Sequence, residues 1–150
     1  MKTRGSAIVE FAIGSGVLMA AFAGTFEFGY SFYIYNNLQN AVNNGAKYAA
    51  FKTYDADSST PSACFQLAVQ DMAVYGNPNP GANLVPAAPG LTANDIFVTV
   101  TMTNGVPTQM NVGVTGYALN SVFATINLSH KPQVTYPYLG RYAPGQGCSP

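Results

Sequence analysis

The sequence predicts an α+β fold: a long N-terminal helix, apolar in its first half and amphipathic in its second, and a small C-terminal domain with one short helix and a small antiparallel sheet. Three observations predict it. Residues 6–35 contain only two charged side chains, residues 34–49 repeat apolar side chains at helical spacing, and residues 96–103 are β-branched and alternating. We therefore expect the helix at 6–52 and a globular domain at 53–150.

The segment 6–35 has the composition of a helix surrounded by lipid or by other helices. Residues 11–26 carry no charge, and apolar side chains occupy every face of a helical projection. A bilayer core needs about 20 helical residues, so a span that starts near residue 6 places Glu27 close to the far interface, followed by aromatic side chains that favour headgroup level. Lys2 and Arg4 precede the span and predict an inside N-terminus with an exported C-terminal portion.

A cleavable secretory signal is the alternative for such an N-terminus. Here, however, the apolar run continues into more helix, and the small residue precedes it at Gly5. Cleavage after Gly5 would place the new amine of Ser6 about one helical turn from the carboxylate of Glu10. Each group can pair with its opposite on a neighbouring subunit, which would offset the cost of about 2.5–3.5 kcal/mol for an ionisable group inside a membrane helix.

Seven residues, in their order and spacing, resemble the N-terminal motif of TadE-like proteins, relatives of type IV pilins. They are Gly5, Glu10, Glu27, Gly29, Gly45, Ala46 and Tyr48. The resemblance covers roughly residues 4–51. Two departures stand out: the family often has proline inside the apolar helix, where this chain has Gly14-Ser15-Gly16, and basic residues after E-x-G, where this chain has Tyr30.

The resemblance implies a structural subunit, a pilin or minor pseudopilin, of a Tad or type IV-like filament. It implies a leader at 1–5 that a prepilin peptidase removes between Gly5 and Ser6, and residence in the bacterial inner membrane before an assembly platform transfers the chain to a cell-surface filament of itself and other pilins. Residues 6–35 would form the membrane and then the filament core, and Glu10, Phe11 and Glu27 would set subunit register. A bitopic, membrane-anchored exported protein that never polymerises remains the alternative.

Beyond residue 34 the helix is expected to continue with a single apolar stripe. Its members recur at helical spacing: Ile34, Leu38, Ala41, Val42, Gly45, Tyr48 and Ala49. Amides and Lys47 fill the other face, which ordinary solvation explains. The polar turn 53–60 ends the helix, and its aspartates lack the spacing and closing glutamate of an EF-hand, so we expect no metal there.

Thr60-Pro61 predicts the start of a second helix, with Thr60 as its N-cap, and Gly76 predicts its end. The expected buried stripe of this helix contains Cys64, Leu67, Ala68, Met72 and Tyr75. Residues 77–94 are rich in proline and glycine and predict a loop.

Strands are expected at 96–103, 108–119 and 133–138, with Asn104-Gly105 as the hairpin turn between the first two. Pro137 in the last indicates an edge strand or a strand end. For residues 120–129 the sequence does not decide between a strand, a helical turn and an apolar flap that packs on the helix.

The composition argues against several functions. Net charge is zero and the six basic residues are scattered, so no nucleic-acid partner is expected. His130 is the only histidine, and no catalytic or metal-ligand cluster can be assembled, so we expect neither an enzyme nor a cofactor. Cys64 and Cys148 stand 84 positions apart; in an exported domain we expect a disulfide worth about 4 kcal/mol, with two buried free thiols as the alternative.

Overall fold

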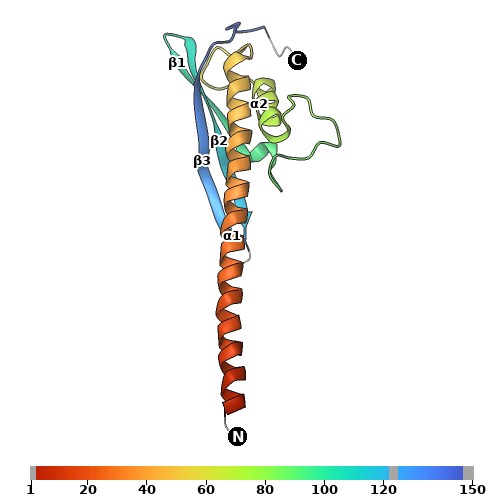
Figure 1. The fold of residues 1–150 in the computed structure, drawn as a ribbon. Helices are drawn as coiled ribbons and strands as arrows, with labels where there is room; N and C mark the ends of the chain where they lie inside the picture. Colours follow the sequence, from red (N-terminus) through yellow and green to blue (C-terminus); the bar gives the residue numbers. More distant parts are fainter. Residues whose placement is uncertain (1–2, 122–124, 147–150) are drawn as a thin grey trace.

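The computed structural model of the chain describes residues 3–121 and 125–146, with side chains from residue 6 onward. It confirms the predicted α+β fold. In chain order the elements are α1 (Thr3–Phe51), α2 (Ala63–Tyr75), the 3-10 turn η1 (Ala93–Asp95), β1 (Ile96–Thr103), β2 (Val106–Asn120) and β3 (Thr125–Pro137). The sheet and α2 flank the C-terminal half of α1 on different sides, and the N-terminal half projects alone (Figure 1).

Helix α1 is continuous, as the persistent helical period predicts. Its predicted stripe is buried from Ile34 to Ala49, apart from Tyr48, which is half-buried. The helix also runs unbroken through Gly14–Gly16, where the Ser15 hydroxyl donates a hydrogen bond to the carbonyl of Ala12 (2.9 Å). The resulting rod is about 70 Å long at the usual rise per residue.

Close approach of α1 and α2 depends on Gly45. A Cβ on this residue would lie 2.8 Å from the Cβ of Ala73 and 3.2 Å from the carbonyl oxygen of Val69. Because real side chains do not tolerate such a distance, a larger residue would push the two helices apart.

Helix α2 begins two residues later than predicted. Ser62, not Thr60, is the N-cap: its hydroxyl accepts from the backbone N–H of Phe65 (3.2 Å) and donates to the carboxylate of Asp55 (2.7 Å). Thr60 loses this role because the contact with Asp55, seven residues upstream of Ser62, selects the later serine. The predicted end is confirmed, since Gly76 is left-handed (φ 67°).

The predicted buried stripe of α2 is wrong. The buried side chains are Phe65, Val69, Gln70, Ala73 and Val74. Leu67 is 53% exposed. Apolar residues surround most of this helix, so its sequence does not single out one stripe, and the positions of α1 and the sheet decide which side chains are covered. The buried Gln70 amide donates to the carbonyl of Ile96 (2.7 Å).

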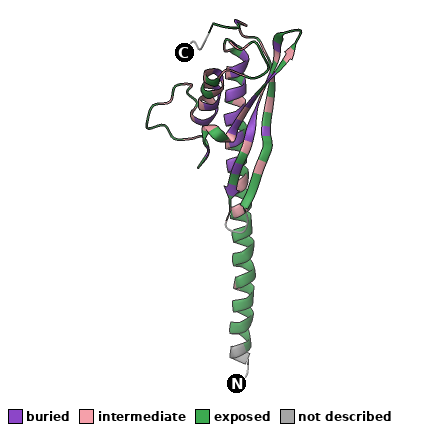
Figure 2. Ribbon diagram, turned by 180° about the vertical axis from the view of Figure 1, so that it is seen from behind, coloured by how far each residue is buried: buried purple, intermediate pink, exposed green. Residues whose placement is uncertain are grey.

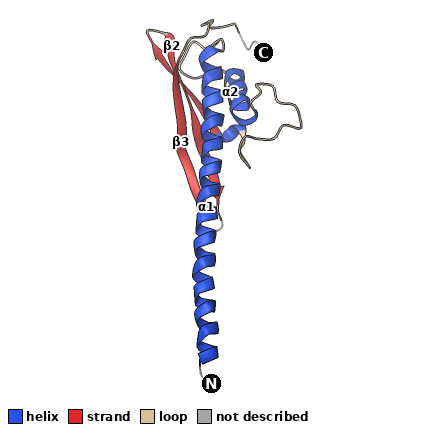
Figure 3. Cartoon of the chain, in the orientation of Figure 1, coloured by secondary structure: helices blue, strands red, loops and turns tan. Residues whose placement is uncertain are grey.

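The sheet is antiparallel with the order β1-β2-β3. Strand β1 has the predicted bounds, and Asn104 (φ 52°) and Gly105 (φ 76°) form the predicted tight turn. Strands β2 and β3 are longer than predicted and pair from Gln109↔Pro137 to Asn120↔Thr125, with register shifts around Thr115. Figure 3 shows the long β2–β3 hairpin beside α1.

Residues 125–129, part of the segment left open by the sequence, are therefore strand. Residues 122–124 lie outside the described part of the chain. The sequence pattern does not reveal this N-terminal part of β3, because it contains only a short alternation of apolar side chains. Backbone hydrogen bonds to β2 stabilise it instead. Pro137 ends β3, as predicted.

Residues 138–143, here called the clasp, cross the C-terminal end of α1. The backbone N–H of Leu139 donates to the backbone carbonyl of Ala50 (2.9 Å). The hydroxyl of Tyr138 donates to the backbone carbonyl of Lys52 (3.0 Å). Tyr54 is fully buried beneath the clasp. Its backbone N–H donates to the carbonyl of Arg141, and its carbonyl accepts from the N–H of Ala143 (2.9 Å each). The clasp thus satisfies carbonyls that a helix end leaves without partners.

Candidate functional site

The candidate functional site is the part of α1 that the rest of the chain does not cover. We call residues 6–30 the uncovered segment. Every residue in it is exposed except Ser15 and Glu27, which are half-buried. Figure 2 shows the N-terminal half of α1 in the colour of exposed residues. Ten large apolar side chains belong to it: Ile8, Val9, Phe11, Ile13, Val17, Leu18, Met19, Phe22, Phe26 and Phe28.

Such a surface is not stable in water. Burying one large apolar side chain contributes about 1.5–3 kcal/mol, so these ten represent roughly 20 kcal/mol, more than the 5–15 kcal/mol by which a whole domain is typically stable. Among the described residues, α1 is the one helix long and apolar enough to cross a membrane, with a mean hydropathy of 1.8 over its most apolar window and none of that window buried. The segment therefore fits membrane anchoring.

The predicted residues of the N-terminal site lie in the first turns of α1. The Gly5–Ser6 bond is within the helix, and Ser6 and Glu10, four residues apart, share one face. Both are exposed, as is Phe11 (78%), so the described part of the chain does not cover these residues.

Glu27 stands apart from these residues. It lies 17 positions beyond Glu10, about 25 Å along the helix axis. The two carboxylates cannot act on one substrate atom, because paired-carboxylate chemistry needs separations below about 10 Å.

Of the two predicted disulfide residues, Cys64 is half-buried in the first turn of α2. Cys148 lies outside the described residues. The Cys64–Cys148 bridge therefore stays a prediction.

An apolar groove that the sequence did not predict lies where the uncovered segment meets the sheet. Its volume is about 350 Å³, and it is lined by Phe28, Ser31, Phe32 and Tyr35 of α1, Leu119 of β2, and Ile126 and Leu128 of β3. The rings of Phe28 and Phe32 pack edge to face, with their centroids 5.2 Å apart. The alternation of Ile126 and Leu128 at strand spacing was the available signal, but only the long β2–β3 pairing brings these side chains to α1.

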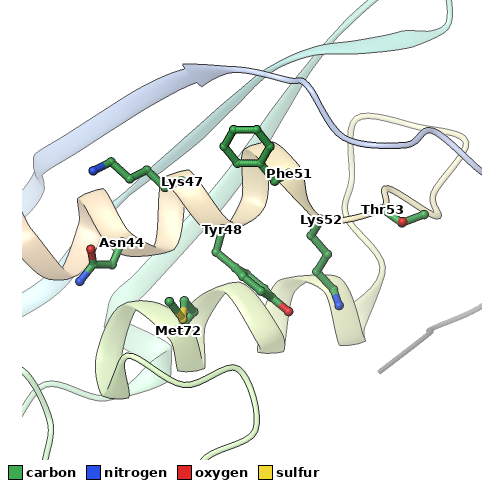
Figure 4. Close-up of a pocket in the computed structure, with 7 residues that line it drawn as sticks. All are labelled: Asn44, Lys47, Tyr48, Phe51, Lys52, Thr53 and Met72. Atoms are coloured by element: carbon green, nitrogen blue, oxygen red, sulfur yellow. The ribbon is translucent and has the colours of Figure 1, made fainter.

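A second hollow, of about 610 Å³, lies between the C-terminal end of α1 and α2. In Figure 4, Tyr48 of α1 and Lys52, which follows the end of α1, extend toward α2, which carries Met72. The Lys52 ammonium is 5.5 Å from the centre of the Tyr48 ring. The titratable residues in its lining are Lys47, Tyr48 and Lys52. The lining contributes no carboxylate or imidazole of its own to act with these groups as an acid–base pair.

Groups with shifted pKa values are dispersed through the domain. Burial, followed by the charge of Asp55, raises the pKa of Tyr54 to about 12. Burial also raises the pKa of Tyr117 in β2 and of Asp71 in α2. These groups lie in different elements, and the described residues contain no group of three or more His, Cys, Asp or Glu side chains able to hold a metal ion.

Comparison with known proteins agrees with the N-terminal motif. The family model described as TadE-like protein matches residues 5–47, which confirms the resemblance predicted from the sequence and relates the chain to the Tad pilus. No curated protein and no solved structure matches.

Proposed function

We propose, from the TadE-like character of residues 5–47, that the chain is a structural subunit, a pilin or minor pseudopilin, of a Tad or type IV-like filament. Its N-terminal helix would hold it in the inner membrane before assembly and then pack against the helices of other subunits. The globular domain would lie on the exported side and finally on the filament surface. Its partners would be copies of itself, other pilins, the prepilin peptidase and the inner-membrane assembly platform.

The uncovered segment carries this proposal. Its apolar side chains need a surround that the chain does not supply, and both acyl chains and the helices of neighbouring subunits supply one. Transfer from membrane to filament therefore exchanges one apolar surround for another. The free energy of assembly can then come from packing and polar contacts, because little apolar surface is newly removed from water.

Glu10 would provide the most specific of those contacts. A carboxylate near the end of a membrane helix is costly when it has no partner. After removal of residues 1–5, the amine of Ser6 on a neighbouring subunit is a suitable partner. Because the pair forms only when the two helices are correctly staggered, it favours one register.

Replacement of Glu10 tests this role. We expect Glu10→Ala to insert in the membrane as the original chain does, while its incorporation into filaments falls about tenfold for each 1.4 kcal/mol of lost pairing. Asp57→Ala is the matched control, because it removes an exposed carboxylate from the globular domain. Filament incorporation of Glu10→Ala at the level of the control would refute the register role.

Mass spectrometry of the mature N-terminus distinguishes the subunit from a non-polymerising anchor. A chain that begins at Ser6 supports processing and assembly, and an intact Met1 on the mature protein supports the anchor. Electron microscopy of the purified protein then shows whether it forms fibres.

A further inference from the structure

The groove at the edge of the uncovered segment carries an inference about how the globular domain sits before assembly. We call residues 119–121 and 125–128 the hairpin end. We propose that the hairpin end rests on the lipid surface at the exported face of the membrane, with Ile126 at the boundary between headgroups and acyl chains. This inference rests on membrane anchoring by the uncovered segment, which is part of the proposed function.

The lengths of the elements place the hairpin end at this level. From Ser6, the 20 residues to Phe26 rise about 30 Å, the thickness of a bilayer core. The next turns of α1, including Phe28 and Tyr35, then emerge among the headgroups. These are the turns that line the groove together with Ile126, and Figure 1 shows the hairpin running along α1 toward its N-terminal half.

The chemistry of the hairpin end suits a lipid surface. The sequence carries no charge between residues 114 and 129, and the first charged residue of β3 is Lys131. Leu119 is buried against the domain, but Ile126 keeps 48% of its surface exposed beside the apolar groove. Apolar side chains next to Tyr35 and asparagine amides resemble the mixed surface of interfacial segments.

Lipid is the occupant we infer for this groove because the groove is continuous with the membrane-spanning surface. Phe28 belongs to both the uncovered segment and the groove lining. Acyl chains that surround the uncovered segment therefore reach the groove without any further partner. The competing occupant is the helix of a second copy, which can enter only once subunits associate.

The opposite end of the sheet provides a matched control. Val106, beside the β1–β2 turn, is also an apolar residue with 48% of its surface exposed. It begins β2, whose other end is Asn120, so about 45 Å of strand separates the two ends. Nonspecific adsorption of exposed apolar side chains to lipid would bring both residues into contact with the membrane. In the inferred orientation, only Ile126 contacts it.

The chain contains no tryptophan, so single tryptophans can report depth. Ile126→Trp, Val106→Trp and Phe22→Trp are prepared in the full chain and placed in bilayers of phosphatidylcholine brominated on its acyl chains, at low protein-to-lipid ratio. We expect loss of tryptophan emission for Phe22→Trp and Ile126→Trp, and unchanged emission for Val106→Trp. Thr125→Trp, exposed at the hairpin end outside the groove lining, repeats the test if Ile126→Trp does not fold.

The outcomes separate the inference from the proposed function. Quenching of Phe22→Trp without quenching of Ile126→Trp leaves the anchor intact and overturns the lipid contact. Absence of quenching for Phe22→Trp overturns the anchor itself. Emission of Ile126→Trp that is unquenched by bromine, but shifts to shorter wavelength as the protein-to-lipid ratio rises, assigns the groove to a second copy and also overturns the inference.

Discussion

Gly140→Ala tests whether the clasp stabilises the end of α1. An added Cβ would lie 2.6 Å from the carbonyl oxygen of Lys52 and 2.9 Å from that of Phe51, whereas carbon–oxygen contacts normally begin at about 3.3 Å. Both neighbours are backbone atoms, so they cannot rotate away as a side chain would. The clasp must therefore move away from the helix end by several tenths of an ångström.

The expected cost follows from two contributions. Overpacking of this kind costs about 1–3 kcal/mol. The shift also weakens the hydrogen bonds from Leu139 to Ala50 (2.9 Å) and from Tyr138 to Lys52 (3.0 Å), each with a net value of about 0.5–1.5 kcal/mol. We expect Gly140→Ala to lower the free energy of unfolding by about 3 kcal/mol, or the melting temperature by roughly 10–25 °C for a domain of this size.

Denaturant unfolding of the full chain in micelles, followed by near-ultraviolet circular dichroism of the tyrosines, measures this loss. Gly81→Ala is the matched control, because it makes the same chemical change in a loop where no described heavy atom lies within 4 Å of the new Cβ. It should be neutral or stabilising by up to about 1 kcal/mol, since alanine restricts the unfolded chain. Equal effects of the two substitutions would refute the role of the clasp.

Two further predictions concern the globular domain. Burial and the charge of Asp55 raise the pKa of Tyr54 to about 12, whereas the pKa of tyrosine in the unfolded chain is about 10. The folded state therefore favours the neutral hydroxyl, and this contribution to the free energy of unfolding is complete below about pH 10. It falls by about 2–3 kcal/mol as the pH rises toward 12. Denaturant titrations across this range should show a smaller loss for Tyr54→Phe, and parallel losses would contradict the assignment. Ser62→Ala removes the N-cap of α2 and should cost about 1 kcal/mol in the same unfolding assay. Exposed Ser59→Ala should change stability by less than about 0.5 kcal/mol, and an equal cost for both would exclude the cap.

The sequence by itself determined the elements that local patterns encode. The charge-free run of residues 11–26 indicated a helix that needs an apolar surround, and the stripe from Ile34 indicated where the helix meets the domain. Strand β1 and the Asn104-Gly105 turn followed from alternation and turn chemistry. In each case neighbouring residues in the chain carry the physical cause, so a short window of sequence contains it.

The tertiary structure decided the features whose causes are distant in the chain. Ser62 is the cap of α2 because Asp55 lies beside it, and the buried face of α2 follows from its packing on α1. The N-terminal part of β3 depends on hydrogen bonds to β2, and the clasp brings Tyr138 to Lys52, 86 residues away.

The candidate site divides in the same way. The uncovered segment was predicted from composition, because a charge-free run of apolar residues is visible within a short window of sequence, and the structure leaves most of this segment exposed. The groove beside Phe28 was not predicted from the sequence, because Ile126 reaches α1 only through the pairing of β2 with β3. Local sequence encodes which surfaces need a partner, and long-range pairing determines which of them stand side by side.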